Sequence, residues 1–313
     1  MTLYLVIPCY NEEEVLPETS KRLKEKFDDL ISKEKISDSS RIVFVDDGSK
    51  DKTWSIIEQL HTTDPCFQGI KLSRNKGHQN ALLAGLMTVK NKCDAAISLD
   101  ADLQDDINAI DLMIDEYNNG CEVVYGVRSS RKKDSFFKRT TAQGFYKFMR
   151  FMGVETVYNH ADYRLMSNRA LDALSEFPEV NLFLRGIVPL VGFKSASVTY
   201  ERGERFAGKS KYPLKKMFSF AFEGITSMSV RPIRLICVLG LFLFFVSIGI
   251  LIYSLVQHLI GNTVSGWTFL NMSIWALGGL QLLAIGIIGE YIGKIYLETK
   301  HRPKYIIDKY LDD

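Results

Sequence analysis

The chain has 313 residues, of which 46% are hydrophobic, and a formal net charge of +2 at pH 7. This length is sufficient for at least one full hydrophobic core and allows two domains. The five cysteines are scattered and form no C-x-x-C pair, which excludes a disulfide framework or a zinc site and is typical of a reducing cytosol.

Residues 1 to about 125 alternate short apolar runs with helical patterns. The predicted elements, in chain order, are a strand at 3–8, a helix at 16–30, a strand at 41–47, a helix near 54–60, a strand at 69–73, a helix at 81–89 and a strand at 95–100. Alternation of this kind favours an α/β domain with a mainly parallel sheet.

Three of these strands end in polar residues, in the stretches "PCYNEEE", "DDGSKDKT" and "DADLQDD". The carboxyl ends of parallel strands lie at one edge of a sheet, and ligands bind beyond that edge. We therefore expect the three polar tips to converge on one site.

Asp100 and Asp102 follow the apolar run Ala95–Leu99. Two carboxylates separated by one residue can face one cavity, and Mg²⁺ or Mn²⁺ prefers such oxygen ligands together with substrate phosphates. The alternative is a solvated acidic loop. For Asp105 and Asp106 we expect either that solvated loop or a helix N-terminus, where they could cap a helix that starts near Ile107.

Asp46 and Asp47 end another apolar strand and are followed by Gly and Ser. Taken alone, this pattern favours a turn with an Asp or Ser cap before the next helix. The alternative is that a carboxylate here accepts hydrogen bonds from a nucleoside, as acidic residues do at strand ends of nucleotide-binding folds.

Two basic stretches with interleaved aromatic residues follow Gly126, at 128–139 and 202–216. They have the chemistry to receive a phosphate, through the fork geometry of arginine, and also to contact anionic lipid headgroups. The stretch Tyr212–Val230 has the pattern of an amphipathic juxtamembrane helix.

No Asp, Glu, Lys or Arg occurs from Leu235 to Gly289, where two apolar runs lie at about 235–257 and 267–289. Each run is long enough, as a helix, to cross a hydrocarbon layer of roughly 30 Å. Basic residues flank both outer ends and the connecting loop has none, which predicts a cytoplasmic large domain and a multi-pass protein of the cell membrane. The short N-terminal run "LYLVIP" does not form a signal-peptide core.

In combination, the motifs are more specific than any one of them. "IPCYNEEE", "VDDGSKDKT", "RNKGHQNAL" and "SLDADLQD" resemble, in order and spacing, the nucleotide-sugar half of inverting family-two glycosyltransferases with the GT-A fold. The continuation "VVYGVRSSR", "ADYRLMSNRAL" and "RGERFAGKSKY", with two apolar spans, looks like the polyprenyl-phosphate glycosyltransferases, which include bactoprenol glucosyltransferases and dolichol-phosphate mannose synthases.

The resemblance implies a donor site and an acceptor site. The implied nucleotide-sugar residues are Pro8, Tyr10, Glu12, Asp47, Lys76 and Asp100. The implied ligands of Mg²⁺ or Mn²⁺ on the diphosphate are Asp100, Asp102 and Gln104. The implied acceptor-phosphate residues are Arg128, Arg139, Arg205 and Lys209.

Asp162 in "HADYRLM" is implied to lie near the reaction centre, where inverting transferases often use a carboxylate base. A phosphate monoester is largely deprotonated at neutral pH, however, and does not require a base. Asp162 is therefore either catalytic or a residue that orients Arg164 or the sugar. His78 is expected to be an ordinary helix-start residue without a ligand role.

The resulting prediction is a GT-A domain at 1–211, a juxtamembrane region at 212–232 and a two-helix anchor with a short tail at 233–313. The expected activity is inverting transfer of glucose or N-acetylglucosamine from a nucleotide diphosphate sugar, UDP-linked, to a polyprenyl phosphate. A homo-oligomer and no nucleic-acid partner are expected. The alternatives are a processive polysaccharide synthase, although the chain has no Arg-Trp pair of the Q-x-x-R-W kind, and a non-catalytic nucleotide-sugar sensor.

Overall fold

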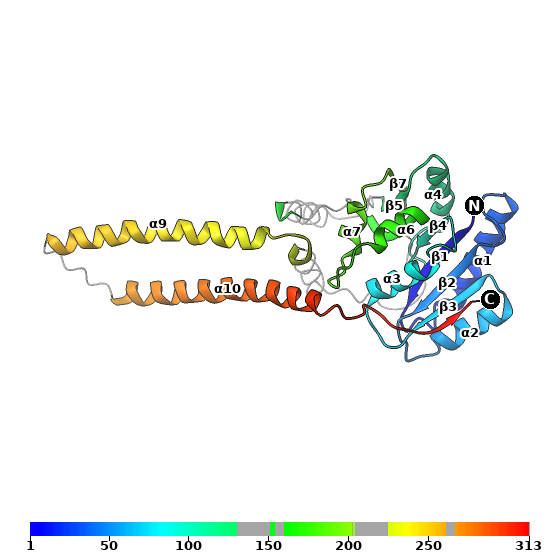
Figure 1. Cartoon of the computed structure of the whole chain (residues 1–313), viewed down its shortest axis with the longest axis horizontal. Coiled ribbons are helices and arrows are strands. Elements are labelled where there is room, and N and C mark those ends of the chain that lie inside the picture. Colours follow the sequence, from blue (N-terminus) through cyan, green and yellow to red (C-terminus); the bar gives the residue numbers. More distant parts are fainter. Residues whose placement is uncertain (130–150, 154–159, 202, 204–224, 261–266, 313) are drawn as a thin grey trace.

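The computed structural model describes residues 1–129, 151–153, 160–201, 203, 225–260 and 267–312. An α/β domain carries two long helices that project from it together (Figure 1). The first half of the domain comprises β1 (Leu3–Cys9), α1 (Leu16–Ser32), β2 (Arg41–Asp46), α2 (Thr53–Thr63), β3 (Phe67–Leu72), α3 (His78–Val89), β4 (Ala95–Ser98) and α4 (Ala109–Asn118). The rest of the chain contributes β5 (Val123–Arg128), β6 (His160–Ser167), α6 (Asn168–Ser175), α7 (Leu184–Leu190), β7 (Ser195–Tyr200), α9 (Arg231–Leu259), α10 (Trp267–Thr299) and β8 (Ile307–Leu311).

The strands form one sheet in the order β7-β5-β6-β4-β1-β2-β3-β8. Strand β1 pairs in parallel with β2 and β4, and β2 pairs in parallel with β3. The expectation of a mainly parallel sheet holds for this centre. The complete sheet is mixed, because β6 is inserted antiparallel between β4 and β5, and β8 pairs antiparallel with β3.

The central strands are apolar because both faces of the sheet are covered by helices. One hydrophobic core lies under α1, α2 and α4, and a second lies under α3, α6 and α7. Every residue of β1 is buried, which explains its continuous apolar run. Pro8 is tolerated inside β1 because the ladder with β4 stops at Val6, so no amide hydrogen is needed on that side.

This topology brings the polar strand tips to one edge. Strands β1, β2, β4 and β5 point the same way, so their carboxyl ends lie together. Strand β6 runs in the opposite direction, and its first residues therefore lie at that same edge. We call this the carboxyl edge of the sheet.

Helices α9 and α10 form an antiparallel hairpin beside each other (Figure 1). Among the described residues, one stretch, Leu277–Thr299 in α10, has the length and hydropathy to cross a membrane. Both apolar runs are helical as expected, whereas two membrane crossings are not confirmed by this criterion. The expected juxtamembrane helix at 212–230 lies outside the described residues up to position 224.

The last strand, β8, differs from the sequence expectation, which is a short tail after the hairpin. Its residues Ile307–Leu311 return to the α/β domain and pair with β3. Asp312 accepts a hydrogen bond from the Gln68 side chain and forms an ion pair with Lys92. The chain therefore leaves the domain before α9 and rejoins it after α10.

Helix α3 packs directly on the sheet at Gly85, and this close contact can be tested. A Cβ atom on Gly85 would lie 2.3 Å from Cγ1 of Val6 and 2.7 Å from Cγ2 of Val45. We expect Gly85→Ala to lower the free energy of unfolding of the detergent-purified protein by about 1–3 kcal/mol, because the helix must move off the sheet. Gly278→Ala on α10 is the control, since a Cβ atom there would have no described neighbour within 4 Å beyond its own helix backbone. Equal thermal stability of the two variants would contradict the packing argument.

Candidate active site

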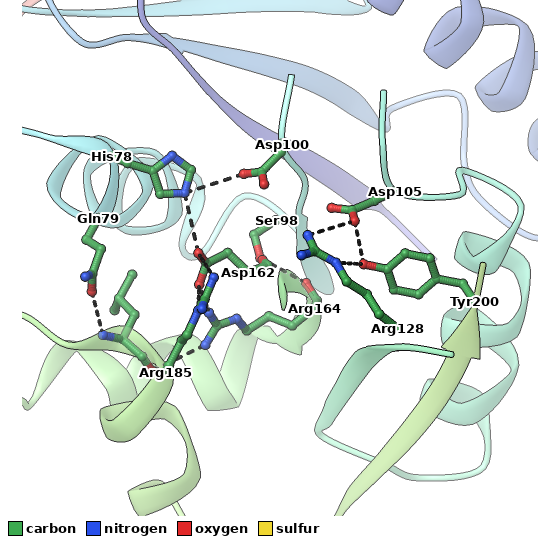
Figure 2. Close-up of polar contacts among 11 residues, drawn as sticks. His78, Gln79, Ser98, Asp100, Asp105, Arg128, Asp162, Arg164, Arg185 and Tyr200 are labelled. Atoms are coloured by element: carbon green, nitrogen blue, oxygen red, sulfur yellow. Dashed lines mark hydrogen bonds and ion pairs between the residues drawn. The ribbon is translucent and has the colours of Figure 1, made fainter. Parts of the chain in front are cut away.

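Side chains from α3, β4, β5, β6, α7 and β7, and from the loop after β4, lie together at the carboxyl edge (Figure 2). Asp100 follows β4, Asp162 lies near the start of β6, and His78 begins α3. The predicted residues that the structure describes at this edge or on the loops leading from it are Pro8, Tyr10, Glu12, Asp47, Lys76, Asp100, Asp102, Gln104, Arg128 and Asp162. Arg139, Arg205 and Lys209 lie outside the described residues.

The carboxylate of Asp162 is bound by two guanidinium groups. Nε and Nη2 of Arg185 donate to its two oxygens at 3.1 and 3.0 Å, and Nη2 of Arg164 donates at 2.8 Å. Although burial alone would raise it, the pKa of Asp162 is held well below its ordinary value by Arg185 and Arg164. Such a carboxylate stays ionised and is a weak proton acceptor. This geometry favours the orienting role over the base.

Asp100 is linked to Asp162 through His78. Nε2 of His78 lies 3.5 Å from Oδ1 of Asp100 and 3.7 Å from Oδ2 of Asp162 (Figure 2). Desolvation raises the pKa of Asp100 to about 6, with His78 opposing the shift and the charges of Asp162, Asp105 and Asp102 adding to it. The expectation that His78 is an ordinary helix-start residue misses this bridging position.

A tight turn follows Asp100. Oδ1 of Asp102 accepts a hydrogen bond from the backbone N–H of Gln104 at 3.2 Å, and Leu103 between them has a φ of 55°. A leucine in the left-handed region is strained and is found mainly where the surroundings require it. The backbone N–H of Gly203 donates to the Gln104 carbonyl at 2.8 Å, which places Gly203 against this turn.

The donor set fits a hard divalent cation. Asp100 and Asp102 supply carboxylate oxygens, and one oxygen of Asp105 is buried with no hydrogen-bond partner among the described residues. In the described part of the chain, no group of three or more His, Cys, Asp or Glu side chains is arranged to hold a metal. A site with two carboxylates suits Mg²⁺ or Mn²⁺, which take their remaining ligands from substrate phosphates and water.

Asp105 does not cap the following helix as expected. It is buried and accepts hydrogen bonds from the Tyr200 hydroxyl at 2.5 Å and from Nη2 of Arg128 at 3.3 Å. Asp106 does accept the backbone N–H of Asn108, at 2.9 Å, just before α4. Arg128, predicted from sequence as a phosphate ligand, thus reaches the edge with part of its guanidinium engaged by Asp105 and Tyr200 (Figure 2).

The tips of β1, β2 and β3 are joined by hydrogen bonds. Both oxygens of Asp47 accept backbone N–H groups, from Lys76 at 2.7 Å and Gly77 at 2.8 Å. The backbone N–H of Glu12 donates to Oγ1 of Thr53 at 2.9 Å. These bonds fix the loops around the predicted nucleotide residues, whereas Tyr10 is 41% exposed at their surface.

Residues 4–175, more than half of the chain, match the family model described as glycosyl transferase family 2. The chain belongs to glycosyl transferase family 2. The family and the GT-A-like fold predicted from the ordered motifs are thereby confirmed. Residues 231–295, which cover α9 and most of α10, match a second model, described as the GtrB C-terminal hairpin.

Relatives in this family match along nearly the whole chain. A protein of Bacillus subtilis (strain 168) named uncharacterized glycosyltransferase YkoT is 59% identical over 98% of this chain and 91% of its own length. The bactoprenol glucosyl transferase of Shigella phage SfV is 42% identical over 98% of each protein. The prophage bactoprenol glucosyl transferase homolog of Escherichia coli (strain K12) is 41% identical over 99% of each protein.

The raised pKa of Asp100 predicts that metal binding depends on pH. Protonation makes a carboxylate a poor metal ligand, so for a cation held by Asp100 we expect the affinity for Mn²⁺ to be highest above about pH 7 and to fall as the pH drops through about 6. We expect the apparent dissociation constant to rise about tenfold for each pH unit below that value, measured by calorimetric Mn²⁺ titration in the presence of UDP. Asp100→Asn removes this dependence. A wild-type affinity for Mn²⁺ that stays constant from pH 7 to pH 5 would contradict the assignment of Asp100 as a metal ligand.

The ion pairs of Asp162 with Arg164 and Arg185 predict a large loss of folding stability when the charge of Asp162 is removed. Arg164 is 1% exposed, so Asp162→Asn leaves a buried guanidinium without its ionised partner. We expect the free energy of unfolding to fall by about 3–5 kcal/mol in chemical denaturation. Asp172→Asn is the matched control, because Asp172 forms an exposed ion pair with Lys90 at 3.2 Å that contributes below about 1 kcal/mol. Similar losses in both variants would rule out the buried cluster.

Proposed function

We propose that this glycosyltransferase transfers a glucose unit from a UDP-linked sugar to a polyprenyl phosphate, with inversion at the anomeric carbon. The observation that carries the proposal is the arrangement of the carboxyl edge. Asp100 and Asp102 supply a site for a cation and a diphosphate, and the guanidinium groups around Asp162 supply positive charge close by. The named bactoprenol glucosyl transferases among the relatives support both the lipid acceptor and glucose.

On the donor side, Asp100, Asp102 and Gln104 would hold Mg²⁺ or Mn²⁺. When bound, such a cation would supply positive charge for the diphosphate leaving group. Pro8, Tyr10, Glu12, Asp47 and Lys76 border the nucleoside, on loops that the hydrogen bonds from Asp47 and Thr53 keep in place.

On the acceptor side, the phosphate of the lipid is the nucleophile. Its second pKa is near 6, so it is already largely ionised at neutral pH and its oxygen attacks the anomeric carbon in line without a general base. Arg185, oriented by Asp162, and Arg128 receive its charge, together with Arg139, Arg205 and Lys209 outside the described residues. Arginine suits this role because its planar fork matches phosphate oxygens.

Both helices of the hairpin are proposed to cross the cell membrane. Helix α9 leaves the α/β domain and β8 returns to it, so the two ends of the hairpin lie on one side of the bilayer. Arg231, Arg234, Lys300 and Arg302 flank these ends, which favours the cytoplasmic side. Confining enzyme and lipid to one plane raises their effective concentration. Self-association of the chain stays a prediction.

The test uses the full chain in liposomes with undecaprenyl phosphate and radiolabelled UDP-glucose, UDP-N-acetylglucosamine or GDP-mannose. Organic extraction followed by chromatography is expected to give one glucose per lipid. A polymer would instead indicate a processive synthase. Nucleotide-sugar binding without any labelled lipid would indicate a sensor.

Asp102→Ala is expected to lower transfer in this assay at least a hundredfold while the protein remains folded and membrane-inserted, because the cation loses a ligand. Asp106→Ala is the matched control from the same loop, since the Asp106 carboxylate accepts the backbone N–H of Asn108 and is not among the predicted cation ligands. We expect the control to retain nearly full transfer. Normal turnover by Asp102→Ala would overturn the metal assignment.

A further inference from the structure

The end of the membrane hairpin is bonded to a loop of the catalytic domain. Glu298, in the last turn of α10, accepts the backbone N–H groups of Val180 and Asn181, each at 2.8 Å. It also accepts Nδ2 of Asn181 at 2.8 Å. One carboxylate therefore fixes the segment that precedes α7 by three hydrogen bonds.

That segment leads directly into the active site. The backbone N–H of Leu184, the first residue of α7, donates to Oε1 of Gln79 at 2.8 Å, and its carbonyl accepts Nη1 of Arg164 at 3.3 Å. The next residue, Arg185, makes the paired contact with Asp162 (Figure 2). Asn181 and Arg185 are thus held at opposite ends of one short stretch, by the hairpin and by the carboxyl edge.

Other contacts hold the same end of α10 in place. Nζ of Lys294 donates to Oγ of Ser227 at 2.8 Å, and the Tyr291 hydroxyl donates to the carbonyl of Ser229 at 2.5 Å. Beyond the helix, Nζ of Lys304 donates to the carbonyl of Phe177 at 3.1 Å. The C-terminal part of α10 and the residues just after it therefore form hydrogen bonds with both the segment before α9 and the segment before α7.

We propose that Glu298 is a positioning residue for the transfer reaction. Through Glu298, the position of α10 on the catalytic domain determines the position of Arg185. By holding residues 180–181, Glu298 fixes where α7 begins and so where the guanidinium of Arg185 faces the incoming lipid phosphate. The role of Glu298 in sugar transfer rests on the proposed function. The mechanical coupling between α10 and α7 is independent of the proposed function.

Hydrogen–deuterium exchange on the full chain in lipid nanodiscs tests the coupling without any activity. Glu298→Ala is expected to increase exchange in peptides that cover 180–190, including the amides of α7. Glu290→Ala, which removes an exposed carboxylate from the same helix, is expected to leave these peptides unchanged. Faster exchange at 180–181 alone, with α7 unaffected, would overturn the proposal.

Steady-state kinetics test the role in transfer. Glu298→Ala is expected to lower kcat at least tenfold while the KM for the sugar donor changes less than twofold. Glu298→Gln, which keeps an acceptor oxygen for Asn181, recovers part of the loss. The double variant Glu298→Ala with Arg185→Ala is expected to be no slower than Arg185→Ala alone, because both act through one group. Fully additive losses would overturn the proposal. If the wild type transfers no sugar to lipid, the proposed function fails and hydrogen exchange alone decides the coupling.

Discussion

The contact of one carboxylate with two guanidinium groups organises the carboxyl edge of the sheet. Asp162 and Arg164 belong to β6, whereas Arg185 comes from α7, so the cluster joins the sheet to a helix that covers it. Removing the charge on one side would leave the other charge buried without a partner. Because this is energetically costly, the paired arrangement is stable. It also gives this edge a cationic side next to the acidic side formed by Asp100 and Asp102, with His78 between them.

The features that can be predicted from the amino-acid sequence have local signals. Strands β1, β2 and β4 are continuous apolar runs because both faces are covered, and each ends in a polar tip, so the pattern of residues alone places Asp100 and Asp102 at the edge. The capping role expected for Asp105 is wrong. That prediction used only the local sequence, in which an acid stands just before a helix. Its partners Arg128 and Tyr200 come from other strands and compete with the helix terminus for it.

The site residues that the sequence does not indicate depend on contacts between distant parts of the chain. No spacing near Arg185 indicates that it will meet Asp162, since α7 and β6 are brought together only by packing on the sheet. Likewise His78 reaches Asp100 and Asp162 because Gly85 lets α3 lie close on β1 and β2. The pairing of β8 with β3 joins the end of the chain to an early strand, and neither segment carries a local signal for the other.

The position of β8 has a consequence for how the protein is made. While the ribosome is still synthesising the hairpin, β3 has an open edge with unpaired backbone groups, a feature that invites wrong pairing with other chains. That edge is covered only when residues 307–311 emerge, after both helices have been made. The sheet of the α/β domain is therefore completed late in synthesis. A product that is truncated or stalled before β8 would leave the edge of β3 exposed and open to pairing with other chains.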